Sequence, residues 1–453
     1  MAQLATQLLG SVEDVLGSRI PLRIRLWDGS QAGPADAPQL VLRNRRALRH
    51  LLWQPGELGL ARAYVSGDLD TAPGTDLYEV LSLAARFAER PEIATLALGP
   101  KDALGPAGRR LLGLLLRAGV LAPQPAPPAE EARLGGGRLH SRGRDRAAIS
   151  HHYDVGNEFY GLVLGPTMVY SCAYWEPEAK SLEAAQTAKL DLICRKLGLR
   201  PGMRLLDVGC GWGSLLLHAA EHYGVRAVGV SISEEQVALA RQRVLAAGLG
   251  GRVEVRLQDY REITDGPFDA VSSVGMAEHV GTAQYQVYAE GLLQLLAPGG
   301  RLLNHQIARR PDRPGEPYRP SPFIQHYVFP DGELSPVGAT VSALEEAGFE
   351  VRDVESLREH YALTLREWVA NLEANWPQAV RLAGQGRARV WRLYMAASAL
   401  AFEQNRIGIN QVLAVRTTPE GASHLPATRP QWLSGAPELH PADPDLGDRP
   451  TVR

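Results

Sequence analysis

Cysteine, aromatic residues and long apolar runs are all scarce in this chain of 453 residues. Its three cysteines, Cys172, Cys194 and Cys210, form neither a disulfide framework nor a metal-binding spacing, so we expect a reducing cytoplasm and no metal. The sequence contains no run of about 18 apolar residues, and no segment is therefore expected to span a membrane. The N-terminus lacks the basic start of a signal peptide, and Glu13 and Asp14 interrupt its apolar residues.

An excess of charge of one sign is also absent. The formal net charge is −2 at pH 7, so no whole-chain field favours nucleic acid as a partner. A content of 45% hydrophobic and 22% charged residues is ordinary for a globular protein, and the length allows two or three domains.

The composition changes twice along the chain and indicates where domains end. Prolines and a glycine triplet at 121–138 predict a linker between a smaller α+β domain at 1–120 and a main domain that starts near 146. We place the linker at 121–145 and the main domain at 146–416. The remaining residues, 417–453, contain seven prolines in 37 positions without apolar periodicity, which predicts a mobile tail.

Apolar strand patterns alternate with helical patterns through the main domain. This alternation predicts an α/β fold with a mostly parallel, doubly wound sheet. The expected strands are 203–208, 226–231, 252–257, 268–273, 299–306 and 411–416. The expected helices are 183–196, 214–223, 234–247, 284–296, 339–347 and 365–405, the last with a break near Trp376-Pro377. In the N-terminal domain we expect strands at 20–28 and 39–43 and helices near 44–53, 59–65, 76–89 and 106–119.

The most informative stretch is 204–214, which reads Arg-Leu-Leu-Asp-Val-Gly-Cys-Gly-Trp-Gly-Ser. An apolar strand ends at Asp207, and Gly209, Gly211 and Gly213 then alternate before a helical pattern. Glycines at such a turn let backbone approach a ligand at a helix N-terminus. The G-x-G-x-G spacing differs from that of dinucleotide sites and suits S-adenosylmethionine (SAM). A purely structural turn is the alternative.

Two further strand ends agree with this interpretation. One ends at Ser231, where a dehydrogenase would normally place an acid, so a nicotinamide cofactor is less consistent with the sequence. The other ends at Gln258, Asp259 and Tyr260, where a carboxylate and an aromatic ring suit an adenine. Taken singly, the second group is equally consistent with a plain turn.

Aromatic and titratable residues gather near the same strand ends. Residues 170–175, Tyr-Ser-Cys-Ala-Tyr-Trp, are dense in aromatics, which suits either core packing or a wall around a sulfonium cation. Glu278 and His279 follow one strand, His305 ends another, and Tyr361 follows His360. Single histidines are commonly structural, but an acid and a histidine at neighbouring strand ends indicate a candidate active site.

Seven motifs, in order over 146–416, resemble those of one enzyme family. The chain is similar to the cyclopropane-fatty-acyl-phospholipid synthases and to the related enzymes that modify mycolic acids. The matching segments are His152 to Asn157, Tyr170 to Trp175, Leu206 to Gly213, Val228 to Ser233, Gln258 to Arg261, Val274 to Gly281 and Tyr327 to Gly332. The N-terminal domain resembles the smaller domain of the longer, phospholipid-acting members.

The resemblance implies a class I SAM-dependent methyltransferase with a Rossmann-like fold. The implied reaction transfers a methylene group from SAM to the cis double bond of an unsaturated acyl chain in a membrane phospholipid. The residues implied to hold a catalytic bicarbonate ion are Cys172, Glu278, His305 and Tyr361, with backbone near Ile307. The SAM contacts that it implies are Tyr170, Ser171, Gly209, Gly211, Ser231, Gln236, Asp259 and Tyr260, and we add Asp207, Gly213 and Gln258 from the strand ends.

This chemistry explains the choice of side chains. An alkene is a weak nucleophile, so the donor methyl must be held in line with it. The cation formed on the acyl chain must be kept from water, aromatic rings can stabilise it, and a base then removes a proton so that a ring closes. One branch of the family instead forms a 10-methylene chain, which a partner reductase converts to 10-methyl. Ala277 stands where some relatives have an aromatic residue, which bears on the shape of an acyl tunnel.

Other functions and partners remain open at this point. A small-molecule methyltransferase and a non-catalytic lipid-binding protein are alternatives to an acyl-chain enzyme. A membrane-embedded substrate requires docking from the cytoplasmic side, and three arginine groups are candidates for a peripheral contact. Solvated surface arginine is the alternative. By analogy with the longer family members we also expect a homodimer. The arginines are Arg43, Arg45, Arg46 and Arg49, then Arg109, Arg110 and Arg117, then Arg138, Arg142, Arg144 and Arg146.

Overall fold

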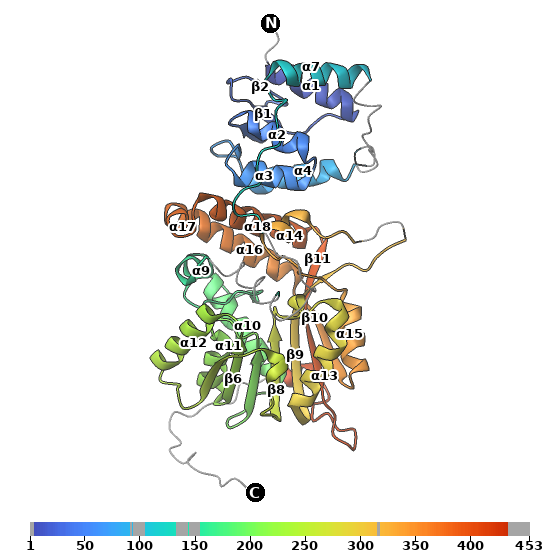
Figure 1. Cartoon of the computed structure of the whole chain (residues 1–453). Helices are drawn as coiled ribbons and strands as arrows, with labels where there is room; N and C mark the ends of the chain where they lie inside the picture. Colours follow the sequence, from blue (N-terminus) through green and yellow to red (C-terminus); the bar gives the residue numbers. More distant parts are fainter. Residues whose placement is uncertain are drawn as a thin grey trace. The chain divides into compact units, whose positions relative to one another are not determined.

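The structure is a computed structural model that describes residues 4–90, 93, 105–132, 144, 155–314 and 318–433 (Figure 1). The chain forms two compact units. The first unit comprises Met1–Val163, Pro314–Asp331 and Leu365–Arg406, and the second comprises Leu164–Arg313, Gly332–Thr364 and Ile407–Arg453. The main domain expected from the sequence, 146–416, therefore contributes to both units.

A seven-stranded sheet forms the centre of the second unit, counted over the described residues. Its strands are β5 (Arg204–Val208), β6 (Arg226–Ser231), β7 (Val253–Leu257), β8 (Phe268–Val274), β9 (Leu296–Arg309), β10 (Glu350–Ser356) and β11 (Ile407–Val415). Their order is β10-β11-β9-β8-β5-β6-β7, with β9 through β7 parallel and β11 antiparallel to both of its neighbours. The predicted α/β fold with a mostly parallel, doubly wound sheet is confirmed.

Helices cover both faces of this sheet (Figure 1). One face packs against α10 (Leu182–Leu197), α11 (Ser214–Tyr223) and α12 (Glu234–Ala246) in a core that includes Ile193, Leu216 and Val237. The other face packs against α13 (Tyr285–Leu295) and α15 (Val337–Glu346) in a second core that includes Leu292 and Leu344. The short elements of this unit are η1 (Tyr260–Glu262), η2 (Ala277–His279), η3 (Thr282–Gln284) and α19 (Arg429–Leu433).

The first unit contains a small sheet with the order β2-β1-β3-β4 and a set of helices. The strands are β1 (Arg23–Arg25), β2 (Gln31–Ala32), β3 (Gln39–Leu42) and β4 (Leu69–Thr71). The N-terminal helices are α1 (Leu4–Leu16), α2 (Arg45–Trp53), α3 (Glu57–Val65), α4 (Leu77–Ala88) and α7 (Pro106–Arg117). Side-chain caps start two of them at the expected places, because Asn44 accepts a hydrogen bond from the N–H of Arg46 and Asp76 accepts one from Tyr78.

Helices from late in the sequence also belong to the first unit. They are α14 (Pro322–Tyr327), α17 (Trp376–Ala383), α18 (Gln385–Glu403) and most of α16 (Arg358–Ala374), which begins in the second unit. The earlier α9 (Asn157–Leu164) belongs to the first unit up to Val163. The buried Arg389 of α18 explains this grouping. Its guanidinium donates to the carbonyls of Tyr64 and Leu69 and to the carboxylate of Asp70. Such contacts between distant segments leave no local signal in the sequence.

The long helical stretch 365–405 breaks near Trp376-Pro377, as predicted, and breaks again at Gly384, which we did not predict from sequence; Gly384 has a φ angle of 79° there. Helix α16 ends at Ala374, and α17 begins at Trp376 with Pro377 in its first turn, a position that tolerates the missing N–H. None of the described helices is long and apolar enough to cross a membrane. The first part of the expected tail forms α19, where Arg429 lies 3.1 Å from a carboxylate oxygen of Asp353, and residues 434–453 lie outside the described residues.

Candidate active site

The glycine turn between β5 and α11 has the backbone that its sequence predicts. Gly209, Gly211 and Gly213 have φ angles of 79°, 52° and 78°, which L-residues with a side chain rarely adopt. The turn is fixed because the N–H groups of Gly209 and of the next residue both donate to the carbonyl of Val230 in β6, at 3.0 Å. A Cβ at Gly209 would lie 3.0 Å from Cγ of Met276. The turn is therefore a narrow backbone cradle at the start of a helix.

Asp207 is a buried anchor directly before this turn. Its carboxylate accepts a hydrogen bond of 2.7 Å from the hydroxyl of Ser272 in β8, and only 3% of the residue is exposed. Burial raises its pKa to about 6, against the opposing effects of the Ser272 hydrogen bond and the nearby Lys189 ammonium. These contacts indicate that Asp207 fixes the turn from inside the protein.

The end of β6 leads into a small polar network. The Ser231 hydroxyl donates to Oε1 of Gln236 at 2.8 Å, and both residues are buried. Ser233 caps α12 by accepting from the N–H of Gln236, which explains why this glutamine lies beside the strand end. The two predicted SAM contacts at this position thus lie together at the carboxyl end of the sheet.

The third strand end, after β7, is held by local pairs. Asp259 pairs with Arg261 at 2.6 Å and caps η1, and the Gln258 amide donates to the carbonyl of Glu262. Tyr260 packs edge-on against Tyr288, with ring centroids 5.7 Å apart. The Gln258 backbone N–H donates to the Ser231 carbonyl, so the second and third strand ends adjoin.

The aromatic segment 170–175 is attached to the start of α16. The Trp175 N–H donates to Nδ1 of His360 at 2.8 Å, and its indole N–H donates to the Thr364 hydroxyl at 3.1 Å. The Ala173 N–H donates to the same hydroxyl, and Tyr174 stacks on the His360 ring with centroids 4.8 Å apart. His360 and Thr364 therefore position this segment, a role that we did not predict from sequence.

Lys189 is a second residue that sequence reasoning missed. It lies on α10, is 2% exposed, and its ammonium donates to the Ser171 hydroxyl at 3.0 Å. Burial lowers its pKa to about 8, although the neighbouring Cys172 and Asp207 favour its charge. The sequence feature that could have identified Lys189 is its position on the apolar face of the helix, four residues after Ala185 and four before Ile193.

Cys172 and Tyr361 meet at one backbone carbonyl. The Cys172 thiol lies 3.6 Å from the carbonyl oxygen of Leu357, which also accepts the N–H of Tyr361 at 3.1 Å. Cys172 is fully buried, and burial raises the pKa of its thiol well above the usual range. The thiol is therefore protonated at neutral pH and can donate a hydrogen bond rather than act as a thiolate nucleophile.

Glu278 and His305 have buried polar atoms without hydrogen-bond partners among the described residues. Glu278 Oε1 accepts from the backbone N–H of Ile307 at 2.8 Å, but Oε2 has no partner. His305 is 1% exposed, and neither ring nitrogen has one. Burial raises the pKa of Glu278 to about 7, and it lowers the pKa of His305 well below its usual range, with the nearby charges of Lys189 and Lys196 acting in the same direction.

The four predicted side chains are linked through a short series of backbone contacts. Ile307, which holds Glu278, follows His305 by two residues on β9 and pairs with Ile409 of β11. The Ile409 carbonyl accepts from the N–H of Leu357, the residue that Cys172 and Tyr361 share. These backbone contacts place the four residues on or beside β9 and β11 of the second unit, although they are far apart in the sequence.

The chemistry available at this place is hydrogen bonding to a small polar group. A buried polar atom without a partner costs about 1–3 kcal/mol, and such atoms cluster here. At neutral pH the histidine and the thiol are uncharged and the glutamate is partly protonated, so an anion would not face a fixed cluster of negative charge. Within the part of the chain that the structure describes, no group of histidine, cysteine and carboxylate side chains could hold a metal ion.

Comparison with known proteins identifies the family. A family model described as mycolic acid cyclopropane synthetase matches residues 140–412, more than half of the chain. The chain belongs to this family. It is 44% identical to a "probable fatty acid methyltransferase" of Mycobacterium tuberculosis over 91% of this chain and 95% of that one. It is 38% identical to the cyclopropane-fatty-acyl-phospholipid synthase of Escherichia coli over 68% of this chain and 78% of that one.

A solved structure of the same family supports the fold and the cofactor. The mycolic acid cyclopropane synthase CmaA1, in complex with SAH and CTAB, superposes with a TM-score of 0.56 at 36% identity, covering 59% of this chain and 97% of that one. This member of the mycolic acid cyclopropane synthetase family is thus a SAM-dependent methyltransferase of the cyclopropane-fatty-acyl-phospholipid synthase type that modifies lipid acyl chains, as the sequence predicted. The roles of its individual site residues stay predictions.

Proposed function

We propose that the protein transfers a methylene group from SAM to the cis double bond of an unsaturated acyl chain in a membrane phospholipid, closing a cyclopropane ring. The observation that carries this proposal is the set of orphaned buried atoms on Glu278 and His305 in one sheet region. The phospholipid-acting relative from Escherichia coli adds support for the substrate class.

The residues at the three strand ends would hold SAM, which supplies an activated methyl group when bound. The turn at Gly209, Gly211 and Gly213 brings backbone to the start of α11, where a carboxylate group is favoured by the helix dipole. Ser231 and Gln236 suit the ribose, and Tyr260 offers a ring face. Lys189 and His360 hold the segment 170–175, so that its aromatic residues form a fixed wall beside the donor.

The orphaned atoms fit a bicarbonate ion, which would supply a base at this point. Glu278, His305, Cys172 and Tyr361 would bind and orient it. The neutral His305 ring offers one N–H donor and one acceptor. The protonated Cys172 thiol would donate to the ion by turning its S–H away from the carbonyls of Ala173 and Leu357. Because Cys172, His305 and Tyr361 are buried, these residues would also exclude water that would capture a cation developing on the acyl chain.

Formation of a 10-methylene chain without ring closure is the alternative product. The relative from Mycobacterium tuberculosis carries the broader name of a fatty acid methyltransferase, which is compatible with either product. The two outcomes share the methylation step, and both lose a proton from the transferred methyl group. They differ because the methylene product first needs a hydride shift, which moves the cation to the carbon that bears this methyl group. If the methylene product forms, a partner reductase would be needed to give a 10-methyl chain.

The test uses the purified protein, SAM and vesicles of a phospholipid with a cis-monounsaturated chain. Mass spectrometry should show the gain of one methylene group, and proton NMR then separates ring protons from exomethylene protons. Glu278→Gln and His305→Ala should reduce turnover far more than SAM affinity, whereas His222→Ala, an exposed histidine of α11, should change neither. Equal losses of turnover and SAM affinity would contradict the assigned roles.

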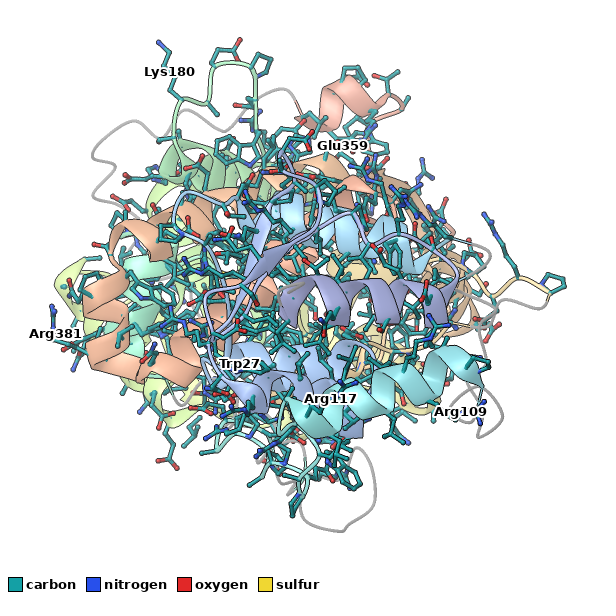
Figure 2. All side chains as sticks on the ribbon, turned by 90° about the horizontal axis from the view of Figure 1, so that it is seen from above. Trp27, Arg109, Arg117, Lys180, Glu359 and Arg381 are labelled. Carbon is teal, nitrogen blue, oxygen red and sulfur yellow. The ribbon has the colours of Figure 1, made fainter. Side chains whose placement is uncertain are left out.

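Docking to the cytoplasmic membrane surface is part of the proposal. On α7, Leu112 and Leu116 are 52% and 66% exposed, while Leu114 and Leu115 pack into the core of the first unit. Figure 2 shows the arginines Arg109 and Arg117 at opposite ends of this helix. Exposed leucines between arginines suit the interface of an anionic membrane.

The other two arginine groups contribute less to this argument. Arg43 and Arg46 pair with Asp70 and Asp68, and Arg45 and Arg49 donate to backbone carbonyls within the first unit. Of the linker arginines, those at 138, 142 and 146 lie outside the described residues, and Arg144 pairs with Asp331. The expected homodimer stays a prediction.

A flotation assay tests the docking surface. Replacing Leu112 and Leu116 together by serine should reduce binding to anionic vesicles about tenfold or more, because the leucines contribute roughly 1–2 kcal/mol each on burial. SAM binding should be unchanged, since both side chains lie in the first unit. Binding of the double variant at wild-type strength, or wild-type binding insensitive to salt and anionic lipid, would contradict the proposal.

A further inference from the structure

Gln411 lies at the centre of β11 and directly faces His305. The two are paired residues of the antiparallel strands β11 and β9. Directly opposite residues in such a pair point to the same face, with Cβ atoms about 4.5–5.5 Å apart. Gln411 is therefore a neighbour of the predicted anion site, although it lies far from His305 in the sequence.

The side chain of Gln411 has no hydrogen-bond partner among the described residues. It is 0% exposed, and both its Nε2 and its Oε1 atoms are orphaned. Together with Glu278 Oε2 and both nitrogens of His305, this places five orphaned polar atoms in one region of the second unit. A buried amide without partners is rare in native proteins and calls for a group that is not part of the chain.

A buried glutamine with a structural role lies on the opposite face of the same sheet and serves as a comparison. Gln306, next to His305, is also buried, but its amide donates to the Tyr285 and Thr340 hydroxyls and accepts from Asn304. Strand alternation sends Gln306 and His305 to different faces. The hydrogen-bonding groups of Gln306 thus have protein partners, whereas those of Gln411, on the other face, have none among the described residues.

We propose that Gln411 is a further anion-binding residue of this enzyme, and this rests on the proposed function of the site. Its amide N–H donates to an oxygen of the bound bicarbonate, and Oε1 is free to accept a hydrogen from the same ion or from His305. A neutral amide suits this place because it adds a donor without adding charge beside Glu278, whose pKa is already raised by burial. The role is binding and orientation; Gln411 takes no proton.

The test is a titration of the full-length protein with carbon-13-labelled bicarbonate followed by NMR, which needs no turnover. Gln411→Met keeps the length of the side chain and removes its polar atoms. We expect the bicarbonate concentration for half-saturation to rise at least about tenfold, as for loss of a hydrogen bond to a charged group. SAM affinity should stay at the wild-type value. Gln411→Glu, with a like charge facing the ion, should weaken binding further.

Stability separates this role from a structural one. Removal of an orphaned amide should leave the melting temperature of the ligand-free protein unchanged or raise it. Gln306→Met, the matched control on the other face, should lower the melting temperature and leave the half-saturating bicarbonate concentration unchanged. A loss of stability in Gln411→Met as large as that in Gln306→Met would overturn the inference.

Two further outcomes distinguish this inference from the proposed function. Bicarbonate binding of wild-type strength in Gln411→Met overturns the role of Gln411, and the proposed function stands if the wild-type enzyme still modifies phospholipid. Failure of the wild-type protein to bind bicarbonate also overturns the role of Gln411. In that case the lipid product, measured separately, decides whether the acyl-chain transfer itself is correct.

Discussion

The pKa of Glu278 gives a prediction that can be worked out from the structure. Burial raises this pKa from the usual 4.5 to about 7 in the folded protein. A carboxyl group with a raised pKa contributes its full stability below pH 4.5 and loses it as the pH rises through 7, because the folded state binds the proton more tightly. The difference between 4.5 and about 7 corresponds to roughly 3 kcal/mol.

Glu278→Gln removes this dependence while keeping the shape of the side chain. The glutamine Oε1 can still accept the N–H of Ile307, which holds Glu278 at 2.8 Å. The free energy of unfolding of the variant, relative to that of the wild type, should therefore rise by roughly 3 kcal/mol between pH 4 and pH 8. Urea denaturation of both proteins without ligands, at pH 4, 6 and 8, measures this difference.

In a matched control variant, stability relative to the wild type should change with pH in the opposite direction. Hydrogen bonds from Arg256 lower the pKa of Asp265, so Asp265→Asn should lose stability relative to the wild type as the pH rises from acid to neutral. If the curves of Glu278→Gln and the wild type run parallel from pH 4 to pH 8, the carboxyl group of Glu278 is not buried as the structure has it. The predicted anion site beside Glu278 would then be refuted as well.

Three other substitutions test the parts around this site. Gly229→Ala should lower stability by about 1–3 kcal/mol in thermal denaturation, because the added Cβ would lie 2.3 Å from a leucine side chain of α11. An unchanged melting temperature would refute this close packing of β6 against α11. Lys189→Met should weaken SAM binding, measured by calorimetry, because it releases Ser171. The difference in SAM affinity between variant and wild type should shrink above pH 8, where wild-type Lys189 loses its own charge. A difference in affinity that persists above pH 8 would exclude a role for the charge. Arg389→Met should destabilise the first unit by about 1–3 kcal/mol in urea, because it removes the buried donor to the carbonyls of Tyr64 and Leu69, while Asp70 keeps its pair with Arg43. The exposed Arg381 (Figure 2) can be replaced by Met at little cost, and equal effects of the two substitutions would contradict this.

Local patterns were sufficient for most of the sheet and for the glycine turn. The parallel strands, the break at Trp376 and the turn at 209–213 all appear where expected, because turn geometry and apolar periodicity act between near neighbours. The edge strand β10 was missed. Its residues are half-exposed and rich in charge, as suits a sheet edge, so the apolar signal is weak there.

The sequence by itself determined the fold class, the cofactor and the family, since these depend on short motifs whose chemistry is local. Only the tertiary structure decided which polar residues share a buried region. Lys189 meets Ser171, and Gln411 faces His305, because helix packing and strand register bring them together. Burial and the supply of hydrogen-bond partners are properties of the assembled core, and they turn an ordinary lysine and glutamine into candidates for function.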